Sequence, residues 1–162
     1  AAVSSPSPPL PPPPPAVPAT TGATATTDAV SGAGVPSGDA VARGASVLFF
    51  GCRTRRDDYL YGAEWEAHRA RGSLAGLHVA FSRAQADKVY VQHLMDRERP
   101  LLWQLLSAGA YVYIAGAANH MPKAVRRALR HAAIEQGGLD EAAADGLLKT
   151  LEARGRLQCE TW

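Results

Sequence analysis

Short apolar runs alternate with segments of helical periodicity through residues 47–161. A brief apolar run bounded by glycine or polar residues is typical of a strand buried on both faces. On this basis we expect strands at 47–51, 77–81 and 111–116, with a closing strand at 156–161. Apolar residues spaced three and four apart predict helices at 59–70, 99–108, 122–136 and 140–153, and residues 88–96 are expected to form a loop that enters a short helix.

The segment 122–136 has a clear amphipathic pattern. Proline suits the first turn of a helix, where its missing N–H costs nothing, and a Gly-Gly pair ends the segment. The apolar positions follow helical spacing and are Val125, Ala128, Leu129, Ala132 and Ala133. The other side carries Lys123, Arg126, Arg127 and Arg130. We expect a solvated cationic face there, with docking of an acidic partner as the alternative.

The alternation of strands and helices predicts an α/β fold with a doubly wound parallel sheet. Ligands of such sheets bind at the carboxyl ends of the strands. Three segments that follow strands are then expected to meet on one rim of the sheet. They are Gly51–Arg53, Ser82–Arg83 and Gly116–Ala118.

The chemistry on this rim suits a phosphorylated aromatic ligand. An arginine fork grips phosphate in a two-point geometry, and lysine adds charge. Serine supplies a short hydrogen bond, and tyrosine offers a ring face. The candidates are Ser82, Arg83, Lys88, Tyr90 and Gln92, although Lys and Gln are also common where a solvated helix begins. An exposed terminal Trp162 could cover a flat ring or dock on the domain's own core.

Composition divides the chain in two. Ten of the 12 prolines lie in residues 1–43, which we expect to be a disordered segment, while residues 44–162 suit one small domain. A net charge of +2 argues against a nucleic-acid binder, and no apolar stretch approaches membrane-spanning length. The histidine spacing makes a metal site improbable, and no nucleophile elbow of a hydrolase occurs. The two cysteines share no CxxC spacing, so reduced thiols are expected.

These motifs together resemble the NADP(H)-binding module of the diflavin reductases, a family that includes NADPH–cytochrome P450 reductase and has a ferredoxin–NADP reductase-like core. The resemblance spans residues 47–162. It rests on the order and spacing of short motifs at 49–53, 58–61, 79–83, 88–93, 113–116 and 160–162. Ala115-Gly116, Met121-Pro122 and the Glu-Thr-Trp end favour the branch of NADPH-dependent diflavin oxidoreductases.

The resemblance implies roles for individual residues. The cofactor-binding positions are Arg53, Ser82, Arg83, Lys88, Val89, Tyr90, Val91, Gln92, Gly116 and Trp162. Ser82, Arg83 and Lys88, with Tyr90 and Gln92, would hold the 2′-phosphoadenosine of NADPH. Trp162 would stack on FAD and swing aside for nicotinamide, and Glu160 would sit beside the hydride path; these two are the catalytic candidates.

The resemblance also implies a larger cytoplasmic enzyme that carries FAD and FMN and passes electrons to an anamorsin-type iron–sulfur protein. The family's first strand and Gly-rich pyrophosphate loop should precede the strand at residue 47, and they are missing from that place. We therefore expect a partial NADP(H)-binding domain that is inactive in isolation. The alternatives are a non-catalytic nucleotide-binding or docking fragment and a P450-reductase-like electron donor.

Overall fold

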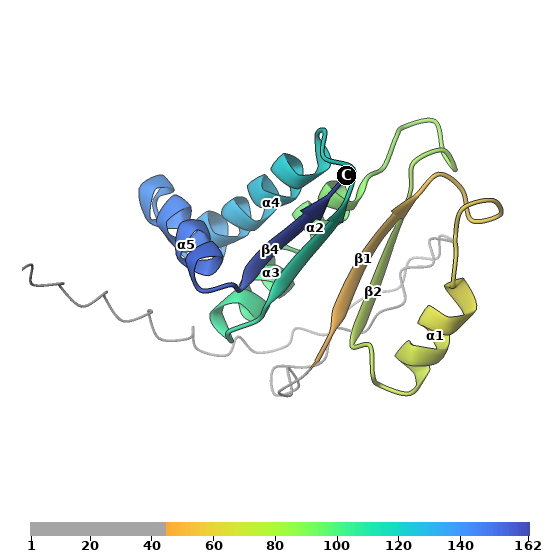
Figure 1. Cartoon of the computed structure of the whole chain (residues 1–162), viewed down its shortest axis with the longest axis horizontal. Helices are drawn as coiled ribbons and strands as arrows, with labels where there is room; N and C mark the ends of the chain where they lie inside the picture. Colours follow the sequence, from red (N-terminus) through yellow and green to blue (C-terminus); the bar gives the residue numbers. More distant parts are fainter. Residues whose placement is uncertain (1–44) are drawn as a thin grey trace, which may run out of the picture.

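The computed structural model describes residues 45–162 (Figure 1), so the predicted disordered segment lies outside the described residues. It confirms a mixed α/β fold with parallel strand pairing. The strands are β1 (Val47–Cys52), β2 (Gly76–Phe81), β3 (Val112–Gly116) and β4 (Leu157–Thr161). The helices are α1 (Gly62–Ala70), α2 (Val91–Arg97), α3 (Arg99–Ser107), α4 (Met121–Glu135) and α5 (Glu141–Ala153).

The four strands form two separate parallel pairs. β1 pairs with β2, with Phe50 opposite Val79, and β3 pairs with β4, with Ile114 opposite Cys159. Figure 1 shows the pairs side by side, with all four carboxyl ends toward the same edge. The expected single doubly wound sheet is therefore not confirmed. The two strand pairs stay separate because a groove lies between β1 and β3 and no described strand bridges it.

Helix α2 links the β1–β2 pair to the rest of the domain. It contacts β1 and β2 on one side and α4 on the other, and Met95 is its buried residue. Met95 belongs to a core shared with α3, α4, α5, β3 and β4. Because this core includes residues from both sides of the groove, it holds the strand pairs in one body although they exchange no ladder hydrogen bonds.

The predicted apolar side of α4 is confirmed position by position. Val125, Ala128, Leu129, Ala132 and Ala133 are all buried, and Leu129 is only 1% exposed. Burial of one helix face is what stabilises such a segment, since propensity alone is too weak.

The opposite side of α4 is only in part the solvated face that we expected, because Lys123 and Arg127 are exposed whereas Arg126 and Arg130 are half-buried. Arg130 forms ion pairs with Glu141 (3.0 Å) and Asp145 (2.7 Å), and Arg126 pairs with Glu152. These carboxylates belong to α5, so the two arginines link α4 to α5 within the domain. Sequence alone missed the pairing because it depends on how the two helices pack.

Candidate functional site

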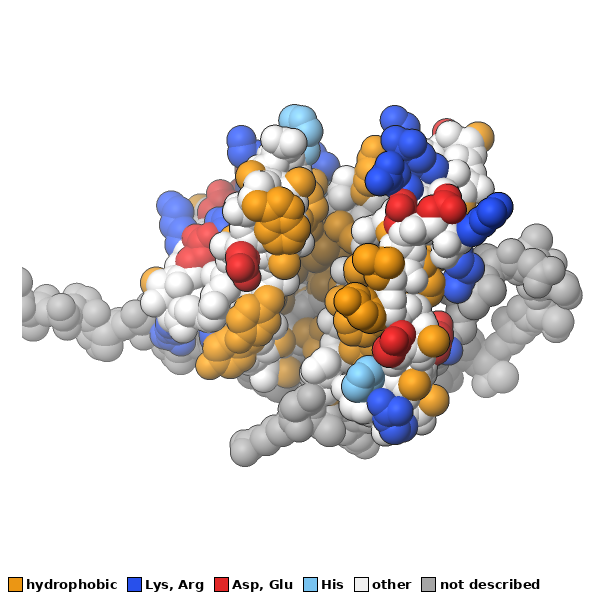
Figure 2. Space-filling view, turned by 45° about the vertical axis from the view of Figure 1, so that its right-hand side comes forward, with side chains coloured by type: hydrophobic (Ala, Val, Ile, Leu, Met, Phe, Trp, Pro, Cys, Tyr) orange, Lys and Arg blue, Asp and Glu red, His pale blue; other side chains and the backbone are white. Residues whose placement is uncertain are grey.

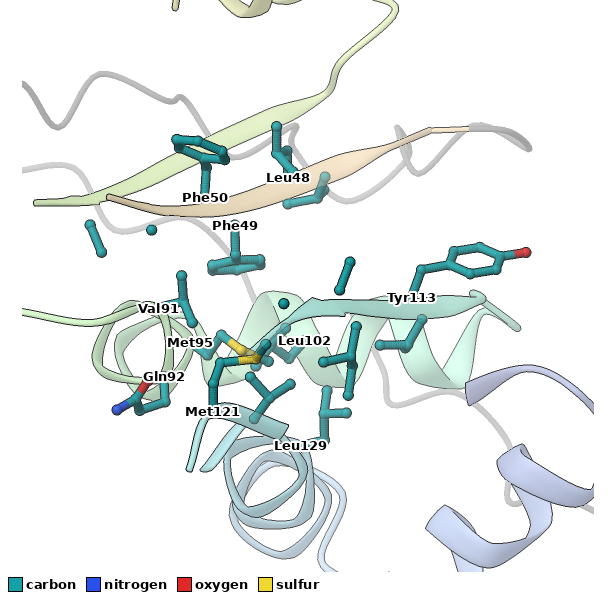
Figure 3. A pocket seen from close by; sticks show the side chains of 18 of the residues that line it. Leu48, Phe49, Phe50, Val91, Gln92, Met95, Leu102, Tyr113, Met121 and Leu129 are labelled. Atoms are coloured by element: carbon teal, nitrogen blue, oxygen red, sulfur yellow. The ribbon is translucent and has the colours of Figure 1, made fainter. Parts of the chain in front are cut away.

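A groove of about 1540 Å³ runs between β1 and β3 along the length of both strands (Figure 2). Its floor is apolar and includes Met95, Leu102 and Leu129, which Figure 3 shows below β1. Seven of the predicted cofactor-binding residues line it: Arg53, Ser82, Val89, Tyr90, Val91, Gln92 and Gly116. The groove therefore gathers segments that the sequence analysis assigned to one rim.

Backbone hydrogen bonds join the segments that follow β1 and β2. The N–H and the hydroxyl of Ser82 both donate to the carbonyl oxygen of Cys52, at 2.8 and 3.2 Å. The N–H of Arg83 donates to the carbonyl oxygen of Arg53 at 2.9 Å. The parallel ladder thus continues past both strands, which brings the two arginines to adjacent positions on the rim.

The loop after β1 is closed by an ion pair. The Nε of Arg53 lies 3.1 Å from a carboxylate oxygen of Asp58, and the Arg53 backbone N–H donates to the same oxygen at 3.0 Å. The Arg53 side chain is 64% exposed. Because most of the side chain is exposed, the guanidinium is accessible to an anion as well as to Asp58.

Arg55 forms a feature of the site that the sequence analysis missed. Its guanidinium carbon lies 5.2 Å from the ring centroid of Tyr59 and 5.0 Å from that of Phe81. The two rings meet edge to face at 5.6 Å. No pattern of spacing predicts this cation–π contact, because Phe81 reaches Arg55 only through the parallel pairing of β1 and β2.

Tyr59 is held by a close backbone approach. A Cβ on Gly62 would lie 2.5 Å from Tyr59 Cε1, so only glycine fits beside the ring. Tyr61, the residue before Gly62, has a φ of 59°. Helix α1 therefore begins at Gly62 and not at the expected residue 59. Burial, with the nearby carboxylate of Glu66, raises the pKa of the Tyr59 hydroxyl, which has no hydrogen-bond partner among the described residues.

Two cations on the rim have no carboxylate partner. Arg83 and Lys88 are exposed and form no ion pair within residues 45–162. Arg53, Arg99 and Arg130 differ in this respect, since each of them has an acidic partner. The positive charge at Arg83 and Lys88 is therefore not neutralised by an ion pair within residues 45–162.

Tyr90 stands at the junction between the rim loop and α2. Its backbone is extended, its N–H donates to His93 Nδ1 at 3.3 Å, and its side chain is 42% exposed. Because α2 begins at Val91, residues 88, 90 and 92 do not form one extended face. Gln92 instead lies in the first turn of the helix.

Gly116 is the last residue of β3, on the other side of the groove. Its φ of +143° favours glycine, and a Cβ there would lie 2.9 Å from Met121 Cε. The Trp162 N–H donates to the Gly116 carbonyl at 3.3 Å, and the Ala118 N–H donates to the Trp162 carbonyl at 3.0 Å. The backbone of Trp162 is thus anchored to the strand end.

The indole of Trp162 is 79% exposed, so it is not docked in the described core. Glu160, the other catalytic candidate, is exposed on β4 opposite Ala115. Neither side chain lines the groove, nor do Arg83 and Lys88. Arg83 and Lys88 follow the end of β2, and Glu160 and Trp162 lie at the end of β4, so all four stand at the carboxyl edge of the strand pairs and outside the groove.

Both cysteines are free thiols. Burial, with the nearby Asp58 carboxylate, raises the pKa of the Cys52 thiol, so Cys52 is a poor nucleophile at neutral pH. Among residues 45–162, no cluster of His, Cys, Asp and Glu could hold a metal ion. No helix in that part of the chain is long and apolar enough to cross a membrane.

The chain is similar in sequence to segments of longer known reductases. The chain is 44% identical over 127 residues to NADPH-dependent diflavin oxidoreductase 1 of Danio rerio, covering 76% of this chain and 21% of the relative. It is 39% identical over 119 residues to human NADPH–cytochrome P450 reductase, covering 74% and 18%. No family model matches the chain.

A bacterial relative extends the comparison. Over 121 residues, the chain is 43% identical to the sulfite reductase [NADPH] flavoprotein alpha-component of Shewanella oneidensis, covering 75% of this chain and 20% of the relative. The chain is therefore homologous to a segment of the NADPH-dependent flavoprotein reductases. It spans about a fifth of the length of the relatives that it matches.

Proposed function

We propose that residues 45–162 bind the 2′-phosphoadenosine part of NADPH within a longer diflavin reductase. The observation that carries this proposal is the unpaired charge of Arg83 and Lys88 beside Ser82. Two cations without ion-pair partners on the carboxyl edge of parallel strands fit a phosphate monoester, and the Ser82 hydroxyl, which donates to the Cys52 carbonyl, would turn to donate to that phosphate. NADPH carries such a group on its adenosine ribose, and NADH does not.

Arg53 supports the same ligand from the neighbouring strand. Its backbone carbonyl accepts from the Arg83 N–H, and its guanidinium, paired with Asp58, is largely exposed. The exposed ring of Tyr90 offers a face for adenine, and Gln92 supplies amide donors and acceptors in the first turn of α2. Val89 and Val91 flank Tyr90 and give the groove mouth an apolar wall.

Trp162 and Glu160 serve the other end of the nucleotide in this proposal. An exposed indole anchored at the rim fits a flat ring system, and we assign it to FAD. When bound, FAD accepts a hydride from NADPH, and FMN passes the electrons on singly. Trp162 would lie against the flavin ring where nicotinamide has to enter, and the Glu160 carboxylate would stabilise positive charge that develops on nicotinamide.

The wider assignment follows the branch motifs in this chain. Ala115-Gly116, Met121-Pro122 and the Glu-Thr-Trp end favour the NADPH-dependent diflavin oxidoreductases, and proteins of that name match at 44% and 46% identity. We propose a cytoplasmic enzyme that delivers electrons to an anamorsin-type iron–sulfur protein. Residues for FMN and for that acceptor belong to the rest of the polypeptide.

Calorimetric titration of the 162-residue chain with adenosine 2′,5′-bisphosphate and with 5′-AMP tests the proposed ligand. We expect saturable binding of the 2′-phosphorylated compound and weaker binding of 5′-AMP. Raising the salt concentration is expected to weaken the first far more, because exposed charges are screened. Equal affinity for both compounds would reject selection by the 2′-phosphate.

A further inference from the structure

The rim loop, residues 82–90, carries the side chains that we assign to the 2′-phosphate and to adenine. Its contacts with the neighbouring strand end at Arg83, whose N–H donates to the Arg53 carbonyl at 2.9 Å. The part of the loop that follows belongs to no helix or strand, and most of it is exposed. Lys88 and Tyr90 lie in this part, so the parallel ladder does not fix their positions.

The Gln85 side chain ties this part of the loop to the end of β2. Its amide nitrogen Nε2 donates to the Phe81 carbonyl at 2.7 Å and to the Asp87 carbonyl at 2.8 Å. An amide nitrogen carries two hydrogens, so each acceptor receives one. Phe81 is the last residue of β2, and the Asp87 carbonyl belongs to the peptide unit that leads into Lys88. Gln85 therefore holds the backbone at Lys88 against the strand end.

The His93 side chain holds the other end of the loop. The Tyr90 N–H donates to His93 Nδ1 at 3.3 Å, and the His93 N–H donates back to the Tyr90 carbonyl at 3.0 Å. This reciprocal pair forms a capping box at the start of α2, with His93 at the third helical position, where glutamate or glutamine is usual. Nδ1 can accept only in the neutral ring, with the proton on Nε2.

The core gives the Tyr90 side chain little support. That side chain is 42% exposed, and the His93 ring lies against it with centroids 5.7 Å apart. The next residue, Val91, packs on the shared core and so places the start of α2. The orientation of the Tyr90 peptide is then left to its hydrogen bond with His93.

Gln85 and His93 are suited to hold the loop and not to contact a ligand. Neither side chain lines the groove. The Gln85 amide nitrogen and the His93 Nδ1 are both engaged with backbone groups of the loop.

We propose that Gln85 and His93 are positioning residues of the nucleotide site. Gln85 places the Lys88 ammonium for the 2′-phosphate, and His93 places the Tyr90 ring for adenine. The inference rests on the proposed function. Because both test nucleotides contain adenine and only one has a 2′-phosphate, the two positioning residues have different signatures. Loss of the Gln85 donors should affect the bisphosphate alone, and loss of the His93 acceptor should affect both nucleotides.

Gln85→Met tests the first residue, because it keeps the length of the side chain and removes both donors. Calorimetric titration of the 162-residue chain is carried out at pH 8, where free imidazole is neutral. We expect about fivefold weaker binding of adenosine 2′,5′-bisphosphate and unchanged binding of 5′-AMP. Gln136→Met is the matched control, because Gln136 is exposed at the end of α4, and it should bind both nucleotides as wild type does.

Two substitutions separate the acceptor of His93 from its ring. His93→Phe keeps an aromatic ring beside Tyr90 but has no acceptor, whereas His93→Gln lacks the ring and restores the usual capping-box acceptor. We expect about threefold weaker binding of both nucleotides by His93→Phe, and wild-type binding by His93→Gln. Without nucleotide, hydrogen exchange of the Tyr90 amide in NMR should be faster in His93→Phe and restored in His93→Gln.

Double variants show whether each positioning residue acts through its partner. Gln85→Met should have almost no further effect in a Lys88→Met chain, because there is no ammonium left to place. His93→Phe should likewise have almost no further effect in a Tyr90→Leu chain. Losses that multiply in the double variants would mean that the two side chains act independently of Lys88 and Tyr90, which would overturn the proposal.

Failure of this proposal is distinguishable from failure of the proposed function. If wild type prefers the bisphosphate but Gln85→Met weakens both nucleotides equally, or His93→Gln binds as poorly as His93→Phe, the positioning roles are rejected and the 2′-phosphate site stands. If wild type binds both nucleotides equally, the proposed function is rejected and the positioning roles with it.

Discussion

Replacement of Arg83 by alanine should weaken binding of a 2′-phosphorylated nucleotide and leave its unphosphorylated counterpart almost unchanged. The Arg83 side chain is exposed and forms no ion pair among residues 45–162, so its removal breaks no internal contact of that kind. A hydrogen bond to a charged group contributes about 1.5–3 kcal/mol. Solvent exposure favours the lower end, which corresponds to roughly tenfold weaker binding.

The assay is calorimetric titration of wild type and Arg83→Ala with adenosine 2′,5′-bisphosphate and 5′-AMP. Arg127→Ala is the matched control, because Arg127 is another exposed arginine but lies on α4. We expect a tenfold loss for the bisphosphate only, and no change for the control. Equal loss for both nucleotides, or an equal effect of Arg127→Ala, would refute the assignment of Arg83 to the 2′-phosphate.

Three further predictions concern the gate, the core and the pH dependence of stability. Trp162→Ala in the longer reductase should lower the NADPH/NADH ratio of kcat/KM, and an unchanged ratio would argue against a gate. Leu129→Ala should lower the free energy of unfolding in urea by about 3 kcal/mol, because Leu129 is 1% exposed. Arg126→Ala, which breaks an ion pair at the surface, should lower it by less than about 1 kcal/mol. Similar losses in the two variants would contradict the assignment of Leu129 to the core. Burial lowers the pKa of His78 from its ordinary value of 6.5, and the nearby Glu98 carboxylate opposes this shift. Because the unfolded chain then binds more protons than the folded chain, the free energy of unfolding should fall as the pH drops below 6.5. His78→Phe should reduce this fall, and a pH profile identical to that of wild type would exclude His78 as its source.

The sequence predicted those features that depend on local spacing. Helix α4 is the clearest example, because every apolar position assigned to its inner side is buried. The segments after β1 and β2 were expected to meet, and the hydrogen bond from Arg83 to Arg53 shows that they do. Both results follow from periodicity and from parallel strand direction, which a single sequence contains.

Features that depend on packing could not be predicted in the same way. The cation–π contact of Arg55 with Phe81 and the ion pairs of Arg130 with α5 join residues far apart in the chain. The separation of the strands into two pairs also escaped prediction, because hydrophobic runs identify strands but not their neighbours. The roles of Glu160 and Trp162 remain predictions.

The central claim is that a 2′-phosphate is held at the rim formed by the ends of β1 and β2. Backbone amide NMR of the 162-residue chain, titrated with adenosine 2′,5′-bisphosphate and with 5′-AMP, tests it most directly. We predict that the bisphosphate shifts the amides of Ser82, Arg83 and Lys88, and that 5′-AMP shifts these three far less. Equal shifts from both nucleotides, or bisphosphate shifts centred on α4 or α5, would contradict the claim.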